Sequence, residues 1–339
     1  MERNMKRILG MVLGAAIATF PITVQAETKE LRVPLGAGGF GFLPLHMMKE
    51  HKLIEKHSAA AGVPVTVNWA NVGGPSVMNE ALLSGSADFI SAGPPAFLTL
   101  WDRTKGTPIE VKAAAGMSSM PMYLNTSAEH LKTLDDIKAE DKIAVTAVKV
   151  SIPSIIMQMH AMQKYGKGEA FRFDRNTVSM THPDGVIAML TGNKQITAHY
   201  TSPPFHQREI KEKGIRTIQT TDDIMGGSTT FTMISTTERF QKANPKVFGA
   251  FLAALKESHQ MIAADKQGAA KVLLDSMGGK GWEISELVAI LNDKDIKYTT
   301  APENLMKYAE FMNSIGTLKN KPANWKEMFF PEMHDQSGS

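Results

Sequence analysis

The feature that most constrains the fold is a turn that recurs along the chain, where a strand-like run ends and a proline opens a helix-like run. Proline suits the first turn of a helix, because the N–H that it lacks would have no partner there and its φ is already helical. Short strands that alternate with helices in this way are typical of a doubly wound α/β sheet with mostly parallel strands. The predicted helix starts are Gly74-Pro75, Gly93-Pro94, Ser151-Ile152-Pro153, His182-Pro183 and Ser202-Pro203.

Two of these starts belong to longer segments that share one order of residues. ALLSGSADFISAGPPAF at 81–97 and AMLTGNKQITAHYTSPPF at 188–205 both run from a helix end through Leu-(Ser/Thr)-Gly and a strand to a Pro-Pro pair. One interpretation is that α/β proteins reuse the same turn chemistry. The other is that the chain contains two similar lobes that face each other. The helix starts of both lobes would then meet at one cleft, where free N–H groups and partial positive charges bind an anion without an arginine.

The first 26 residues have the pattern of a secretory signal peptide. A basic head with Arg3, Lys6 and Arg7 precedes the apolar run 8–20, and Val24-Gln25-Ala26 resembles a cleavage site. The apolar run is shorter than the ~20 residues that a membrane-spanning helix needs. We therefore expect cleavage after Ala26 and a mature protein located in the periplasm.

Composition excludes several classes of function. The chain of 339 residues has no cysteine, which excludes a thiol nucleophile, a thiolate metal site and a lipid-modified cysteine. The formal net charge is +3, and lysines and glutamates are scattered without the basic stripe that nucleic-acid binding needs. The length suits two domains, or one domain of two lobes.

The run GAGGFG at 36–41 matches the glycine fingerprint of dinucleotide-binding folds. That fingerprint also requires an acidic residue about 20 positions later, at the end of the second strand. Here the second strand ends in NWANVGG, and no acidic residue follows before Glu80. We therefore expect no nucleotide cofactor, and we interpret these glycines as positions where the backbone approaches a ligand.

The histidines do not predict a metal site. His46, His51 and His57 are spaced five and six residues apart, which does not place them on one face of a helix. His182 and His199 have no carboxylate at ligand spacing. Both are interpreted either as hydrogen-bond donors to a ligand or as structural residues.

Several segments together resemble the periplasmic substrate-binding proteins of ABC importers in the nitrate/sulfonate/taurine class, which have a type II periplasmic binding protein fold. The resemblance covers roughly residues 30–275. Its segments are LRVPLGAGGFGFLPLHMMKEHKLIEK, EALLSGSADFISAGPPAF, TLDDIKAEDKIAVTAV, HPDGVIAMLTGNKQITAHYTSPPF and NPKVFGAFLAALKESHQMI.

This resemblance implies two lobes, each a doubly wound, mostly parallel sheet with helices on both faces, and a ligand cleft between them. Residues 27–118 and 228–339 would form one lobe, and residues 119–227 the other. The chain would cross between the lobes near 118–121 and 226–229, and these crossings would act as the hinge for closure on a ligand.

The resemblance also implies which residues bind the ligand. The expected ligand-binding residues are Gly38, Gly39, Phe40, Gly74, Ser76, Gly93, Pro94, Lys149, Ser151, His182, Tyr200 and Thr201. Helix amides near Gly74, Gly93 and Ser151 would hold a charged head. The expected further donors are Ser76, Lys149, His182 and Thr201, and the expected apolar contacts are Phe40, Trp69 and Tyr200. Lys149 has an alternative interpretation as a solvated loop charge.

The predicted function is that of a monomeric receptor that binds a small anion of the sulfonate, nitrate or carboxylate type. It would deliver the anion to an ABC permease with its cytoplasmic ATPase. A neutral heterocycle such as a thiamine-related pyrimidine is an alternative ligand, and the receptor of an ion-driven transporter is an alternative role. An exported enzyme of the same fold is less favoured, because the enzymes of this fold considered for comparison rely on a cysteine, and this chain has none.

Overall fold

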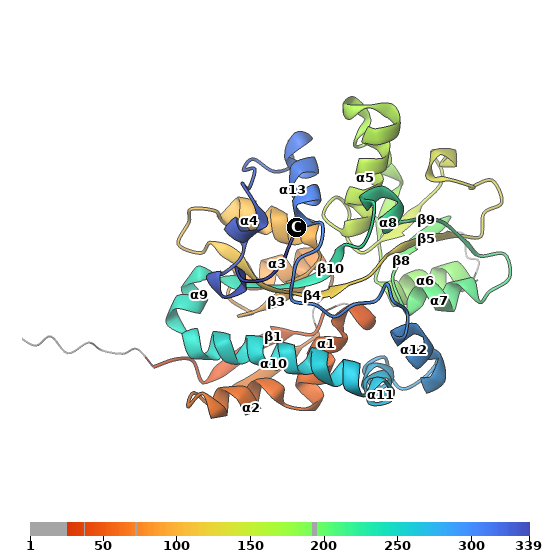
Figure 1. The fold of residues 1–339 in the computed structure, drawn as a ribbon. Helices are drawn as coiled ribbons and strands as arrows, with labels where there is room; N and C mark the ends of the chain where they lie inside the picture. Colours follow the sequence, from red (N-terminus) through yellow and green to blue (C-terminus); the bar gives the residue numbers. More distant parts are fainter. Residues whose placement is uncertain (1–25, 37, 72, 192–194) are drawn as a thin grey trace, which may run out of the picture.

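The computed structural model describes residues 26–36, 38–71, 73–191 and 195–339. The predicted signal peptide lies outside these residues, apart from Ala26. Within them, helices and strands alternate over most of the chain and the strands form two groups, which Figure 1 shows side by side. We call the part with β1–β4 and β10 the first lobe, and the part with β5–β9 the second lobe. In the described part of the chain, no helix is both long and apolar enough to cross a membrane.

The strands of the first lobe form two small sheets among the described residues. The parallel pair consists of β1 (Glu30–Pro34) and β2 (Thr66–Ala70). The three-stranded sheet has the order β3 (Ile90–Ala92), β10 (Thr230–Thr237) and β4 (Val111–Ser119). All three residues of β3 are buried, including the polar Ser91.

The second lobe contains a five-stranded sheet within the described residues. Its order is β7 (Thr177–Ser179), β6 (Ile143–Val145), β8 (Ala198–Thr201), β5 (Tyr123–Thr126) and β9 (Arg216–Thr220). The chain thus passes from one group of strands to the other between β4 and β5, and returns between β9 and β10. The predicted lobe boundaries and hinge segments fall at these two passages, and the division itself stays a prediction.

The sheets are mixed, which corrects the prediction of mostly parallel strands. β1–β2, β6–β7 and β6–β8 are parallel, whereas β5 runs antiparallel to β8 and β9, and β10 runs antiparallel to β3 and β4. Every antiparallel pair among the described strands therefore contains β5 or β10. These are the first strands that the chain forms after it enters a lobe from the other one. Their direction is set by the crossing, which local sequence patterns do not encode.

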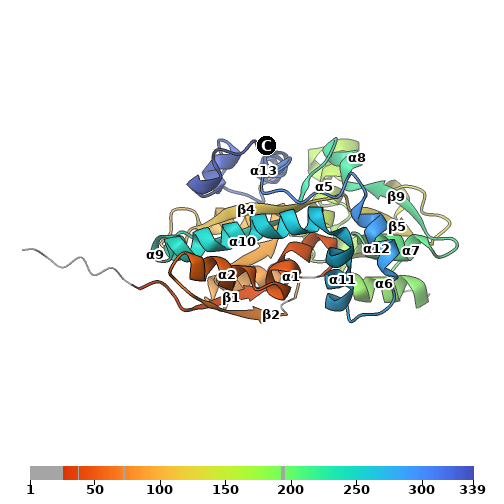
Figure 2. The same ribbon diagram turned by 60° about the horizontal axis from the view of Figure 1, so that its bottom comes forward.

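Helices cover both faces of the sheets. Figures 1 and 2 place α1, α2 and α10 on one face of the β3-β10-β4 sheet and α4 and α13 on the other. In the second lobe, α5 and α8 lie on the opposite face from α6 and α7. The helices are α1 (Leu43–Glu50), α2 (Leu53–Ala60), α3 (Pro75–Leu83), α4 (Pro94–Thr104), α5 (Ile152–Tyr165), α6 (His182–Thr191), α7 (Phe205–Ile210), α8 (Thr221–Met225), α9 (Glu238–Ala243), α10 (Pro245–Ala264), α11 (Lys266–Ser276), α12 (Ile284–Leu291) and α13 (Leu305–Ser314).

The two Pro-Pro pairs have different structures. Pro94 and Pro95 are the first two residues of α4, as predicted. Pro203 and Pro204 are joined by a cis peptide bond and form a turn, and α7 begins only at Phe205. The predicted helix start at Ser202-Pro203 is therefore wrong by two residues, because this pair forms the turn that leads into the helix.

Buried histidines predict that stability falls as the solution becomes acidic. Burial lowers the pKa of His259 on α10 to about 4, and its Nε2 is buried without a hydrogen-bond partner among the described residues. Below pH 6.5 the unfolded chain takes up a proton at this histidine, and the folded protein does so only near pH 4. The burial of His259 therefore does not affect the free energy of unfolding above pH 6.5, and it lowers that free energy increasingly as the pH falls towards 4.

We expect His259→Gln to reduce the loss of unfolding free energy by about 1 kcal/mol for each pH unit in this window. Urea denaturation at pH 7.5, 5.5 and 4.5 measures that slope. His51→Gln, at an exposed position, is the control and should leave the slope unchanged. Equal slopes in the wild type and His259→Gln would contradict the prediction.

Candidate ligand site between the lobes

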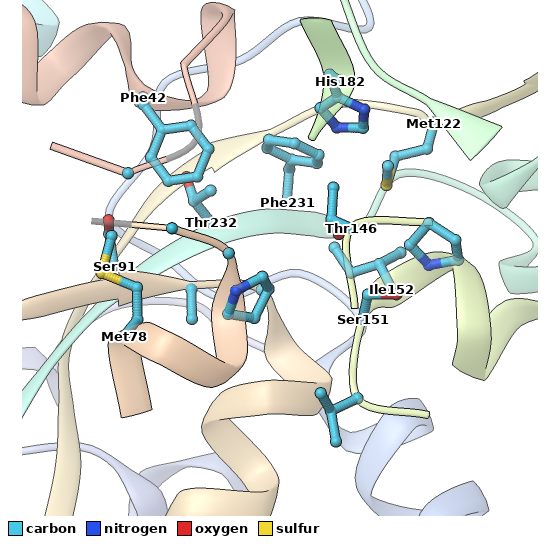
Figure 3. A pocket seen from close by; sticks show the side chains of 18 residues that line it. Phe42, Met78, Ser91, Met122, Thr146, Ser151, Ile152, His182, Phe231 and Thr232 are labelled. Carbon is cyan, nitrogen blue, oxygen red and sulfur yellow. The ribbon is translucent and has the colours of Figure 1, made fainter. Parts of the chain in front are cut away.

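A small cavity lies between the lobes, with walls from both of them (Figure 3). Its volume is about 40 Å³, room for the centres of about three water molecules. The lining residues are Gly36, Phe42, Gly73, Gly74, Pro75, Met78, Ser91, Ala92, Gly93, Met122, Thr146, Val150, Ser151, Ile152, Pro153, His182, Phe231 and Thr232. A wider cleft of about 630 Å³ adjoins it and shares Gly36, Gly73, Gly74 and Thr146 with it.

Within the described residues, four helices begin at the wall of this cavity. α3 and α4 come from the first lobe, and α5 and α6 come from the second. Each start carries a partial positive charge of about half a unit, because the first N–H groups of a helix have no partner within it. The sequence therefore predicted correctly that starts from both halves of the chain lie together, with the exception of Ser202-Pro203.

Prolines reduce the number of N–H donors at these starts. α3 has Pro75 at its first position, α5 has Pro153 at its second, and α6 has Pro183 at its second. At α4 both of the first two positions are proline, so Pro94 and Pro95 offer no N–H at all. The helix starts keep their dipoles but present fewer direct hydrogen bonds than a typical anion-binding helix start.

The side chains around the cavity are uncharged. None of the described lining residues is Asp, Glu, Lys or Arg. Burial, with a smaller contribution from His199, holds the pKa of His182 well below its ordinary value of 6.5, so the imidazole is neutral at pH 7. Figure 3 shows Phe42, Phe231 and Met122 around the same space. The site is thus a mainly apolar cavity, and its electric field comes from backbone dipoles.

Ser91 differs from Ser151 and Thr232, two other residues with hydroxyl groups at the cavity. The hydroxyl of Ser151 donates to the carbonyl of Ala147 at 2.6 Å, and that of Thr232 donates to the carbonyl of Gly41 at 2.8 Å. Ser91 is 2% exposed, and its hydroxyl has no hydrogen-bond partner among the described residues. Since an unpaired buried hydroxyl costs about 1–3 kcal/mol, Ser91 is a candidate hydrogen-bond partner for a ligand.

Of the predicted ligand residues, Gly74, Gly93, Ser151 and His182 line the cavity. Their role in binding stays a prediction. Because the hydroxyl of Ser151 already donates to the carbonyl of Ala147, it does not have a free hydrogen to donate to a ligand.

The remaining predicted residues do not line this cavity. Those buried elsewhere in the fold are Gly39, Phe40, Pro94, Tyr200 and Thr201, and those more exposed are Gly38, Trp69, Ser76 and Lys149. The Phe40 N–H donates to the carbonyl of Pro203 in the second lobe at 3.3 Å, so this end of the glycine-rich loop contacts the other lobe, whereas Gly36 at its start lines the cavity. The exposure of Lys149 agrees with its interpretation as a solvated loop charge.

Some of the residues that sequence reasoning missed lie close to a predicted crossing or one helical turn beyond a helix start. Met122, between β4 and β5, and Phe231, the second residue of β10, both lie within two residues of a predicted hinge segment. Met78 follows Gly74 by four residues, which places it on the same face of α3. Ser91 had no signal of its own, because a serine in a short buried strand is usually structural.

The described residues contain no group of three His, Asp or Glu side chains placed to hold a metal ion. His182 and His199 do lie together, with Nδ1 of the first 3.3 Å from Nε2 of the second. The carboxylate near them is Glu209, which is 0% exposed and contacts His199 alone of the pair.

No protein-family model matches the sequence, and no curated protein sequence matches it either. Solved structures do match the fold. The alkanesulfonate-binding protein SsuA from Xanthomonas axonopodis pv. citri, bound to MOPS, has a TM-score of 0.67 and 16% identity over 87% of this chain and 96% of that one. The periplasmic aliphatic sulphonate binding protein SsuA from Escherichia coli has a TM-score of 0.63 and 17% identity over 91% and 100%.

A third match comes from a eukaryote. The Candida albicans CA3427 gene product, described as exhibiting the generic periplasmic binding protein structural fold, has a TM-score of 0.63 and 12% identity over 89% of this chain and 94% of that one. The predicted two-lobed α/β fold is confirmed by these likenesses, with the correction to strand direction given above. The chain therefore has the periplasmic binding protein fold, with a small cavity between its lobes.

Proposed function

We propose that this protein is an extracytoplasmic receptor that closes around a small organic anion, of the sulfonate type, and delivers it to an ABC permease. It acts in the periplasm as a monomer, after removal of residues 1–26. The observation that carries the proposal is the cavity between the lobes, at which helix starts from both lobes converge. The alkanesulfonate and aliphatic sulphonate binding described for two proteins of the same fold favours sulfonates among the possible anions.

The geometry divides such a ligand into two parts. A compact charged head would occupy the inner cavity of about 40 Å³, whose lining includes the starts of four helices and Ser91. The rest of the molecule extends into the adjoining cleft of about 630 Å³. Closure excludes water, which strengthens the interaction of the head with the dipoles.

A ligand panel tests this proposal. Mature protein is freed of bound molecules by unfolding and refolding, and thermal unfolding is then followed with taurine, longer alkanesulfonates, nitrate, carboxylates and an aminopyrimidine. A ligand at a hundredfold over its Kd adds about 2.7 kcal/mol, a shift of roughly 5–10 °C. We expect the sulfonates to give this shift. No shift with any anion would contradict the proposal.

A neutral heterocycle is the second candidate ligand, because the described lining has no charged side chain and prolines remove several N–H donors. Phe42 and Phe231 would then pack against its ring. A shift with the aminopyrimidine alone would establish this candidate.

Removing the hydroxyl of Ser91 should weaken binding of the sulfonate that gives the largest shift. The loss of one hydrogen bond of about 1 kcal/mol predicts that Kd rises about fivefold in Ser91→Ala. Ser76→Ala is the matched control, because Ser76 is exposed and does not line the cavity. Titration calorimetry measures both Kd values. An equal Kd in both variants would rule out contact between Ser91 and the ligand.

A further inference from the structure

Three buried side chains form a continuous path from the interior of the second lobe to the cavity. Glu209 on α7 lies with its Oε1 2.5 Å from Nδ1 of His199 on β8. Nε2 of His199 lies 3.3 Å from Nδ1 of His182, at the start of α6. Glu209 and His199 are both 0% exposed and His182 is 2% exposed. His182 lines the cavity, where Figure 3 shows it above Phe231.

We propose that the Glu209–His199 pair fixes the tautomer of His182, so that its Nε2–H is a permanent hydrogen-bond donor to an oxyanion in the cavity. His182 would thus determine ligand specificity, and Glu209 and His199 would be positioning residues that act through it. This deepens the proposed function, on which it rests. It restricts the ligand to molecules that present an acceptor oxygen at this wall, and it disfavours amines and other donors there.

The first step of the argument is that the path must be electrically neutral. An isolated charge in a protein interior costs several kcal/mol or more. The one ion-pair partner of Glu209 among the described residues is His199. His206, which also lies on α7 and contacts Asn125, is uncharged at pH 7 because burial lowers its pKa to about 4. No other cation compensates the carboxylate in the described structure around it.

With His182 itself neutral, two arrangements of protons leave the path neutral overall. In one, the Glu209 carboxylate pairs with an imidazolium at His199, which has N–H groups on both ring nitrogens. In the other, a protonated Glu209 donates to Nδ1 of His199, whose single N–H is then on Nε2. In both arrangements, Nε2 of His199 carries a hydrogen and donates it to Nδ1 of His182.

His182 must then carry its own proton on Nε2. The ring is neutral, and a neutral imidazole has one N–H, whose position is set by the hydrogen bond at the other nitrogen. The second contact of the ring agrees with this assignment, because the hydroxyl of Thr201 lies 3.5 Å from Nδ1 and can also donate to it. Both hydrogen-bond contacts of His182 among the described residues fall on Nδ1, so Nε2 is the nitrogen available to the cavity.

The remaining contacts hold the path in place. The amide of Asn125 on β5 donates to Oε2 of Glu209 at 2.9 Å, and its carbonyl accepts from the hydroxyl of Thr217 at 2.7 Å. Gly185 on α6 leaves room for the ring of His199, since a Cβ there would lie 2.4 Å from it. The opposite arrangement has Nδ1–H on both histidines. It would leave a buried net negative charge and would turn an acceptor towards an anionic ligand.

The tautomer can be measured in the ligand-free protein, so this test does not depend on the proposed function. Two-bond 15N–1H correlations of the imidazole rings distinguish a protonated from an unprotonated ring nitrogen, and the signals that His182→Gln removes belong to His182. We expect protonated Nε2 and unprotonated Nδ1 at pH 7. A proton on Nδ1 would overturn the inference, even if the panel identifies a sulfonate ligand.

Variants of Glu209 test whether the tautomer is imposed from inside the lobe. Glu209→Gln can donate its amide to Nδ1 of His199 and accept from Asn125, so we expect the wild-type tautomer and a sulfonate Kd within about twofold of the wild type. Glu209→Leu removes the partner of His199, so both tautomers of His182 should appear and Kd should rise at least tenfold. An unchanged tautomer in a folded Glu209→Leu protein would refute the role of Glu209.

Discussion

Replacing Gly74 with alanine is expected to weaken sulfonate binding at least about fivefold while the fold stays intact. A Cβ at this position would lie 2.9 Å from the backbone carbonyl oxygen of Thr146, in the opposite lobe. A backbone atom cannot rotate away as the end of a side chain can, so the lobes must separate by a few tenths of an ångström. Overpacking of this kind costs about 1–3 kcal/mol, which corresponds to a rise in Kd of about fivefold to 150-fold.

The backbone of Gly74 itself accepts an alanine, because its φ of −66° and ψ of −173° are ordinary for any residue. Gly73→Ala is the matched control. Gly73 also lines the cavity, but the nearest atom to its Cβ would be a methyl group of Val77 at 3.4 Å, within the same lobe. Calorimetric titration with a sulfonate from the panel compares the two variants, and urea denaturation without ligand compares their folds. Equal Kd values in both would show that this contact does not limit closure.

Phe89→Ala is expected to lower the free energy of unfolding by about 3–5 kcal/mol, the range for truncating a fully buried phenylalanine. Phe89 is 0% exposed, and its ring stacks on that of Phe251 with centroids 4.0 Å apart. It also contacts Phe240 edge-on at 5.2 Å and Phe248 at 6.1 Å. The cluster packs α9 and α10 against Phe89, which directly precedes β3, the strand that contains Ser91.

Phe171→Ala is the control for this truncation. Because Phe171 is 48% exposed, its truncation should lower the free energy of unfolding by no more than about 0.5 kcal/mol. Guanidinium denaturation at pH 7.5 measures both differences. A loss below about 1 kcal/mol for Phe89→Ala would mean that the aromatic cluster does not contribute to stability as its burial indicates.

Local sequence predicted the parts of the site that depend on local physics. The prolines after Gly74, Gly93 and Ser151 marked helix starts correctly, because a missing N–H and a fixed φ act within a few residues. The signal at Ser202-Pro203 was wrong by two residues, since the same dipeptide serves equally well in a turn. The grouping of starts from both halves followed from the repeat of two similar segments.

The tertiary structure decided which side chains reach the cavity. Tyr200 was expected at the ligand and is 0% exposed without lining the cavity, whereas Phe231 lines it because the chain returns to the first lobe there. The path from Glu209 to His182 joins residues on α7, β8 and α6.

By itself, then, the sequence determined the alternation of helices and strands, the positions of most helix starts and the absence of thiol chemistry, because these depend on neighbouring residues or on composition alone. Tertiary structure decided the direction of β5 and β10 and the close approach of Gly74 to Thr146. It also decided that the hydroxyl of Ser91 is buried without a hydrogen-bond partner among the described residues. Each of these depends on distances between segments that are far apart in the chain, and no local preference specifies such distances.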